Sequence, residues 1–288
     1  MAIMKTILVP TDFSDCANYA SETAIELAKK TRSEIHFYHF MSIPVDWLHL
    51  SGPDAEKMYP EVSRQVRFIK NQLAERVKMA EAKGIVAKPF IGYNESVEDI
   101  IRYAADQRVN MIVMGSHGSK GLKEFFIGSN AQKIVRQSRV PVFIVKHPLA
   151  SIKFDNILFV SNFEAEMLQP FEHVIALADL LGAKVNLLYI NTPAAFVETW
   201  EVRQKMETFI ALAGSKLHKA ETIDTRFFEE GIEKYCEENN DGLLTIATHH
   251  TSGMSRFFLG GLAEKVVNHV KIPVMSIPIR EWSGYPRL

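Results

Sequence analysis

Apolar and polar positions in the first half of the chain follow two alternating patterns. Five short apolar runs, each typical of a buried strand, lie at residues 5–9, 34–41, 85–91, 111–114 and 140–145. Between them, apolar side chains recur at helical spacing, which predicts helices over residues 16–30, 61–83, 97–104 and from residue 129 onward. Alternating strands and helices form βαβ units, so the pattern predicts a parallel sheet with helices on both faces.

Local signals refine this pattern at three places. Residues 42–60 are rich in proline and glycine, so we expect an irregular segment there, whose role the sequence leaves open. Pro141 removes a main-chain donor, which places the last strand at a sheet edge or makes it start just there. Before the first helix, Ser14 and Asp15 are both candidate N-caps.

The same pattern recurs in the second half of the chain. Residues 156–163 and 184–191 resemble residues 6–13 and 34–41 at an offset of 150. Residues 243–250 and 271–277 resemble residues 111–118 and 139–145 at an offset of 132. Ordered matches of this kind predict a tandem duplication. We therefore expect the 288 residues to form two tandem Rossmann-like domains, at residues 1–147 and 152–280, each a five-stranded parallel sheet with helices on both faces.

Composition narrows the function classes. The formal net charge is -1 without a basic excess, which argues against nucleic-acid binding. No apolar run approaches the roughly 18 to 20 residues that a membrane span needs, and the apolar start is too short for a signal peptide, so we expect a cytoplasmic protein. Cys16 and Cys236 fall in predicted helices of different halves, which favours reduced packing thiols over a disulfide.

The strongest chemical signal is a glycine pattern that follows the fourth strand. Met114 leads into Gly115-Ser-His-Gly118, and Gly128-Ser129 follows at the start of an amphipathic helix. A helix start offers free N–H groups and the positive end of the helix dipole, and glycine lets a phosphate approach the main chain. The spacing G-x2-G-x9-G-S therefore predicts a phosphate cradle. It matches neither the Walker nor the dinucleotide-binding spacing.

The duplicated half serves as an internal control for this site. Ligands of parallel sheets bind beyond the carboxyl ends of the strands, which puts Asp12 on the same rim as the glycine turn. The second half replaces Asp12, Gly115, Gly118 and Ser129 by Asn162, Ala247, His250 and Gly261, and keeps Gly128 as Gly260. Because added Cβ atoms would occupy the phosphate path, we interpret the first half as competent for nucleotide and the second as degenerate.

These features together resemble the universal stress protein family over nearly the whole chain, as two tandem domains. The residues that carry the resemblance are Val9-Pro-Thr-Asp12, His39-Phe40, Gly115-Ser-His-Gly118 and Gly128-Ser129. The resemblance implies an adenine-nucleotide-binding α/β fold of five parallel strands in proteins that respond to stress, with ATP, with or without Mg²⁺, as the cofactor. It also implies pairing through the last strands. Here the two domains would pair within the chain through residues 142–145 and 274–277, while a homodimer and unknown protein partners stay open.

The resemblance further implies the residues of a nucleotide site. Pro10, Thr11 and Asp12 would face the adenosine near Phe40, Met114, Gly115 and Gly118 would line the ribose and phosphate path, and Gly128, Ser129 and Asn130 would hold the phosphates. Asn130 departs from the small or β-branched residue that is common at its position.

Two function classes remain, beside a nucleotide-free interaction or dimerisation module. A regulatory ATP-binding protein with little or no turnover is favoured, because no base, nucleophile or metal-carboxylate set accompanies the cradle. The rival is a slow ATPase or adenylyl-transferring enzyme, in which His117 and Asp12 would supply the chemistry. His249-His250 lacks a third metal ligand, and Lys120 and Lys123 either contact phosphate or solvate the loop.

Overall fold

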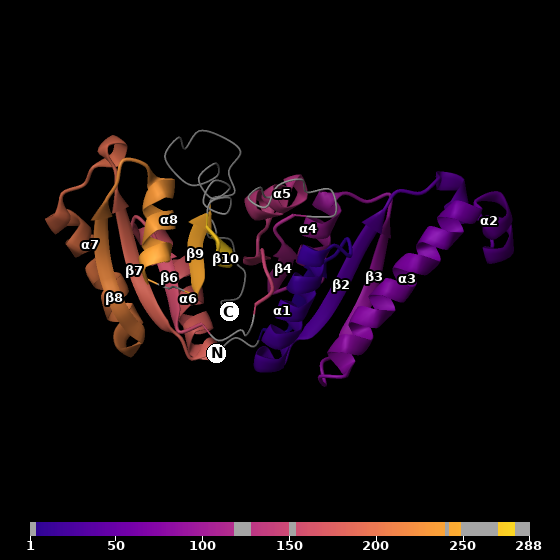
Figure 1. Cartoon of the computed structure of the whole chain (residues 1–288), viewed down its shortest axis with the longest axis horizontal. Coiled ribbons are helices and arrows are strands. Elements are labelled where there is room, and N and C mark those ends of the chain that lie inside the picture. The colour runs from indigo at the N-terminus through magenta and orange to yellow at the C-terminus, as the bar shows by residue number, and fades with distance from the viewer. Residues whose placement is uncertain (1–3, 118–127, 150–153, 240–241, 249–269, 280–288) are drawn as a thin grey trace.

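The computed structural model describes residues 4–117, 128–149, 154–239, 242–248 and 270–279. Ten described strands form one continuous sheet in the order β3-β2-β1-β4-β5-β10-β9-β6-β7-β8, with five strands from each half (Figure 1). All described strand pairs are parallel except β5 with β10. The predicted α/β fold is thereby confirmed.

Both halves follow the same order of strands, β3-β2-β1-β4-β5 in the first and its equivalent β8-β7-β6-β9-β10 in the second. The first half contains β1 (Thr6–Pro10), α1 (Asp15–Thr31), β2 (Glu34–Met41), η1 (Val45–His49), α2 (Gly52–Met58), α3 (Pro60–Glu81), β3 (Ala87–Tyr93), α4 (Val97–Asp106), β4 (Met111–Gly115), α5 (Ser129–Gln137) and β5 (Val142–Val145). The second contains β6 (Asn156–Val160), η2 (Ala165–Met167), α6 (Leu168–Leu181), β7 (Lys184–Asn191), η3 (Pro193–Ala195), α7 (Thr199–Ala213), η4 (Gly214–Lys216), β8 (Leu217–Asp224), α8 (Phe228–Asn239), β9 (Leu243–Thr248) and β10 (Val274–Pro278).

Helices cover both faces of the sheet. One apolar cluster joins the strands to α1, α3, α6 and α7, and a second joins their opposite face to α4, α5 and α8. Successive strand residues alternate between the two, as Val113 and Met114 do on β4. No helix among the described residues is long and apolar enough to cross a membrane.

The two halves join through their last strands. β5 and β10 pair antiparallel, with Ile144 opposite Val274, Phe143 opposite Met275 and Val142 opposite Ser276. The expected pairing of residues 142–145 with 274–277 is confirmed. β5 is therefore a central strand, so of the two expectations for Pro141 only the second holds: the strand starts just after it.

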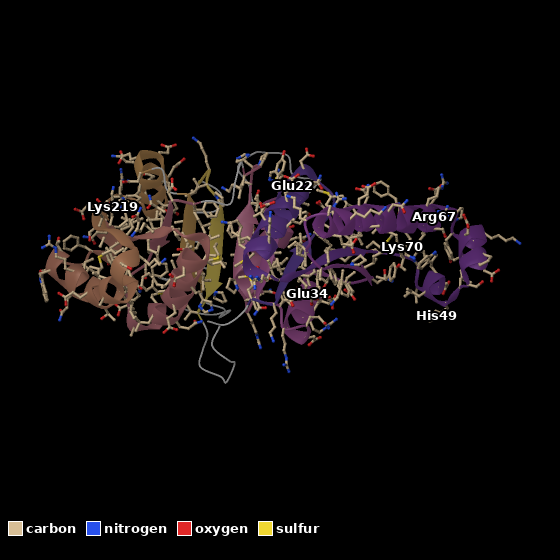
Figure 2. All side chains as sticks on the ribbon, turned by 90° about the horizontal axis from the view of Figure 1, so that it is seen from below. Glu22, Glu34, His49, Arg67, Lys70 and Lys219 are labelled. Atoms are coloured by element: carbon tan, nitrogen blue, oxygen red, sulfur yellow. The ribbon has the colours of Figure 1, made fainter. Side chains whose placement is uncertain are left out.

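The expectation of an irregular segment at residues 42–60 is wrong. Residues 45–49 form the short helix η1, residues 52–58 form α2, and Pro60 is the first residue of α3. A proline is well tolerated in the first turn of a helix, where its missing N–H has no partner in any case. Figure 2 labels Arg67 and Lys70 on α3, and Arg67 Nη1 lies 2.6 Å from Oε1 of Glu56 on α2.

Tertiary contacts also shift the third strand and decide the first helix cap. β3 begins at Ala87, two residues later than expected, because Ile85 still donates its N–H to Ala80 of α3 (3.0 Å). Ser14 is the N-cap of α1, and its hydroxyl accepts a hydrogen bond from the Ala17 N–H (3.3 Å). The chain can thus turn directly from β1 into α1.

Gly115 allows α1 to lie against the end of β4. A Cβ placed on Gly115 would lie 2.8 Å from the main-chain carbon of Cys16 and 2.9 Å from its Cβ. A glycine is therefore needed here for packing between helix and strand, a requirement that the sequence-based interpretation did not include.

A buried lysine lies at the junction between the halves. Lys146 directly follows β5, is 8% exposed, and donates from Nζ to the main-chain carbonyl of Val270 in the second half. Burial lowers the pKa of this ammonium group from 10.5 to about 8.

Replacing Gly115 by Val should destabilise the protein, because the added carbons overlap the main chain of Cys16. We expect a loss of about 1 to 3 kcal/mol in the free energy of unfolding, measured by urea denaturation. Gly52→Ala is the matched control, since a Cβ at Gly52 meets nothing within 4 Å. A Gly115→Val protein as stable as the wild type would contradict this role.

The free energy of unfolding should contain a contribution from Lys146 that rises between about pH 8 and pH 10.5. In this window the unfolded chain binds a proton at Lys146 that the folded chain has lost, so raising the pH favours the folded state, by up to about 3 kcal/mol. Below pH 8 both states are protonated and the contribution is constant. Other groups titrate in the same range, so the quantity to measure is the difference between wild type and Lys146→Met in urea denaturation from pH 7 to pH 10. Equal slopes for the two proteins would contradict the prediction.

Candidate functional site

The loops after β1, β2 and β4 meet at one edge of the sheet. β1 pairs in parallel with β2 on one side and with β4 on the other, and β4 pairs in parallel with β5. The carboxyl ends of these strands therefore lie side by side, as expected for Asp12 and the turn that begins at Gly115.

The loop between β1 and α1 is held in one conformation by its own hydrogen bonds. The Thr11 N–H donates to the carbonyl of Tyr38 (2.9 Å), and the Thr11 hydroxyl accepts from the Phe13 N–H (3.1 Å). Oδ1 of the exposed Asp12 accepts from the Ser14 N–H (3.1 Å). Phe13 has a φ of 64°, in the left-handed region that non-glycine residues rarely adopt. These contacts present the Asp12 side chain at the rim of the sheet.

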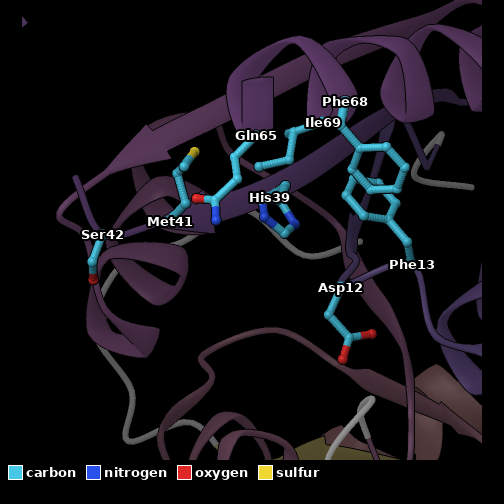
Figure 3. Close-up of a pocket in the computed structure, with 8 residues that line it drawn as sticks. All are labelled: Asp12, Phe13, His39, Met41, Ser42, Gln65, Phe68 and Ile69. Carbon is cyan, nitrogen blue, oxygen red and sulfur yellow. The ribbon is translucent and has the colours of Figure 1, made fainter. Parts of the chain in front are cut away.

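A cavity of about 380 Å³ opens beside this loop, which is a volume typical of small-molecule sites. It lies between the β1–α1 loop, the end of β2 and the helix α3 (Figure 3). Its lining consists of Asp12, Phe13, His39, Met41, Ser42, Gln65, Phe68 and Ile69. Of the residues expected at the site, Asp12 lines this cavity, and Pro10 and Thr11 directly precede it. The half-buried Phe40 instead packs against the apolar cluster on the opposite face of the sheet.

Sequence reasoning missed the contribution of α3 to this cavity. In the helical pattern of residues 61–83, Ile69 falls on the apolar side, whereas Gln65 and Phe68 fall on the polar side. The available signal was the large aromatic side chain of Phe68 among charged neighbours, and in the structure it remains 57% exposed.

Stacked rings form one wall of the cavity. The rings of Phe13 and His39 stack with centroids 4.8 Å apart and planes 15° apart, and Phe68 meets Phe13 edge-on at 6.3 Å. On α3, the guanidinium carbon of Arg76 lies 4.8 Å from the Phe13 ring centroid. Arg76 is buried and donates to Oδ1 of Asn18 on α1 (2.6 Å), so it ties α3 to α1 and supports Phe13.

The turn after β4 leads to an uncapped helix start. The Ser116 N–H donates to the carbonyl of Val145 (2.9 Å), and the Gly128 N–H donates to the carbonyl of Ser116 (2.8 Å). Gly128 is the N-cap of α5, whose first residues Ser129 and Asn130 are exposed, and no side chain in the described part of the chain caps this end. Such a start presents N–H groups without intrahelical partners.

Other residues of the expected site are buried or fall outside the described residues. Met114 is buried in the cluster under α4 and α5. Gly118, Lys120 and Lys123, as well as His249, His250, Gly260 and Gly261 in the second half, lie outside the described residues.

His117 lies against the start of α1. Its Nε2 is 3.4 Å from Sγ of Cys16, and its Nδ1 is 3.0 Å from the hydroxyl of Ser116. Burial raises the pKa of the Cys16 thiol, which keeps it protonated at neutral pH. Cys16 and Cys236 are both free thiols in helices of different halves, as predicted. Among the described residues, no group of three potential ligands could hold a metal ion.

The second half has a closed aromatic cluster at the equivalent place. Phe163 repeats the left-handed conformation of Phe13, with a φ of 56°, and Tyr189 stands at the position of His39. Phe209 of α7 is fully buried and its ring centroid lies 5.1 Å from that of Phe163. Large apolar side chains thus fill the space beside Phe163, whereas the space beside Phe13 is open.

Comparisons with known proteins agree with this description. The model of the universal stress protein family matches residues 4–146 and 153–278. A universal stress protein of Synechocystis is 29% identical over 95% of this chain and 99% of its own length. A crystal structure of a universal stress protein from Archaeoglobus fulgidus superposes with a TM-score of 0.72 at 21% identity, covering 96% of this chain and 99% of that one.

A further solved structure is a universal stress protein in complex with cAMP, at 22% identity and a TM-score of 0.39, and it covers 51% of this chain and 100% of that one. With the family model matched once in each half, the chain belongs to the universal stress protein family, as a protein with two tandem domains.

Proposed function

We propose that this chain is a cytoplasmic regulatory protein of the stress response that binds one ATP in its first domain, residues 1–147. The second domain, residues 152–280, binds none in this proposal. The observation that carries the proposal is the cavity of about 380 Å³ at the carboxyl edge of the sheet, on the same rim as the uncapped start of α5.

The cavity suits the base and the ribose of an adenine nucleotide. Phe68, Ile69 and Met41 offer apolar contact to the flat faces of a purine, and Asp12 offers a carboxylate to ribose hydroxyls at the mouth. The family resemblance implies further contacts from the main chain of Pro10 and Thr11, which precede Asp12, and from Phe40, which follows His39 on β2.

The triphosphate belongs at the start of α5. Gly128, Ser129 and Asn130 form its first turn, where main-chain N–H groups and the helix dipole favour negative charge. Gly118 is proposed for the path that leads there. Gly115 and Met114 act by shaping the turn, through packing against α1 and against the core. Mg²⁺, where bound, would be held by phosphate oxygens and water.

The site is connected to the junction between the domains. α5 is followed by β5, which pairs with β10, and Lys146 at the end of β5 contacts Val270. ATP at the start of α5 would therefore affect the conformation of the junction, and protein partners would recognise the resulting conformation. We assign no turnover to the site.

Native mass spectrometry with added ATP should detect one ATP per chain. Asp12→Asn should weaken ATP binding about tenfold, because the amide keeps an acceptor for the Ser14 N–H but loses the charge that strengthens a hydrogen bond to ribose. The matched control is Asn162→Asp at the equivalent position of the second half, where Oδ1 accepts from the Glu164 N–H (3.2 Å).

The control variant should leave both affinity and stoichiometry unchanged. Two ATP per chain would show that the second domain is also competent. Unchanged affinity in Asp12→Asn would remove Asp12 from the site, and no binding to the wild type would overturn the proposed function.

A further inference from the structure

His39 is held in a single tautomer by the loop before α1. Its Nδ1 lies 2.7 Å from the main-chain carbonyl of Thr11. A carbonyl oxygen only accepts hydrogen bonds, so Nδ1 carries the proton and donates it. In the neutral ring Nε2 then carries a lone pair, and no hydrogen bond to Nε2 exists among the described residues.

The geometry also fixes where this lone pair is available. The ring stacks on Phe13, which is supported by Arg76, so it cannot turn freely about its own bonds. Figure 3 shows His39 between Gln65 and Phe13 on the wall of the cavity. The half-buried imidazole is therefore a fixed acceptor inside the cavity.

The other polar side chains of the cavity are less selective. The hydroxyl of Ser42 and the amide of Gln65 can each donate or accept, so they fit either kind of ligand group. The carboxylate of Asp12 is exposed at the mouth and accepts from the Ser14 N–H. His39 is thus the inner group that distinguishes a donor from an acceptor on a ligand.

We propose that Nε2 of His39 accepts a hydrogen bond from the exocyclic amino group of the purine, and thereby selects 6-amino purines over 6-oxo purines. The inference rests on the proposed function, since it names the group that reads the base in the same cavity. A 6-oxo purine would place an acceptor opposite the lone pair and leave both groups without a partner. Selection by a hydrogen bond of this kind gives about a 10- to 100-fold difference in affinity.

The selection depends on the charge state of His39. Burial lowers its pKa below the usual 6.5, while the Thr11 carbonyl and the Asp12 carboxylate in the β1–α1 loop act in the opposite direction. On α3, Gln65 is neutral, and the charged Arg76 lies against Phe13. The ring is therefore neutral at pH 7.5, and protonation at a pH below its lowered pKa converts Nε2 into a donor that fits a 6-oxo group.

The test compares three purine nucleoside triphosphates by isothermal titration calorimetry: ATP, ITP with a 6-oxo group, and purine riboside triphosphate with hydrogen at position 6. The variant is His39→Phe, which keeps the ring stacked on Phe13 and removes both nitrogens. The matched control is Tyr189→Phe, at the equivalent position of the second half.

At pH 7.5 the wild type and Tyr189→Phe should bind ATP at least about tenfold more tightly than ITP. In His39→Phe the affinities for ATP and ITP should differ by no more than about threefold. Purine riboside triphosphate should bind to this variant as tightly as it binds to the wild type. The ratio of the wild type should also fall as the pH is lowered through the depressed pKa of His39, and that of His39→Phe should not change.

Other outcomes distinguish a failure of the proposed role of His39 from a failure of the proposed ATP binding. A preference for ATP that persists in His39→Phe would overturn the role of His39 and leave ATP binding in place. An equal loss of affinity for all three ligands would show that His39 only supports the cavity wall. No binding of any of the three to the wild type would overturn the proposed function and this inference with it.

Discussion

The parallel pairing of β1 with both β2 and β4 is the constraint on which the rest of the structure depends. It brings the loop with Asp12, the strand end with His39 and the turn after Gly115 to one edge of the sheet. The absence of a side chain on Gly115 lets α1 begin directly at this edge. The cavity then forms because α3 packs against β2 from the same side as α1, with Arg76 joining the two helices.

The antiparallel pairing of β5 with β10 joins the strands of both halves into one continuous sheet. Ten described strands share one hydrogen-bonded sheet, and α1 and α6 contribute to one continuous apolar cluster across the junction. The domains are therefore mechanically connected through main-chain bonds rather than through a linker alone. The buried ammonium group of Lys146 lies at this junction, at the end of the strand that follows α5.

Local sequence patterns predicted the strands well because buried strands need continuous apolar runs. β2 and β7 occupy the predicted residues, and the helix start at Gly128 is where the glycine pattern put it. Features that depend on a distant neighbour were missed. The need for glycine at position 115 arises from Cys16, almost a hundred residues away, and no pattern around Gly115 reveals it.

The candidate site likewise contains residues that the sequence predicts and residues that only the packing of distant elements brings there. Asp12 could be placed at the rim from topology alone, whereas Gln65 and Phe68 line the cavity only because α3 packs beside β2. The tautomer of His39 depends on the carbonyl of Thr11 in another element. In the second half, the buried ring of Phe209 on α7 packs against Phe163, a contact that the substituted glycines do not reveal.

Hydrogen exchange of the whole chain with and without ATP tests the central claim most directly, because it locates the nucleotide and its effect together. Our account predicts slower exchange in the β1–α1 loop, at the start of α5 and in β5 and β10, with no change in the loop between β6 and α6. Equal protection of that loop, or protection that leaves the β1–α1 loop unchanged, would contradict it.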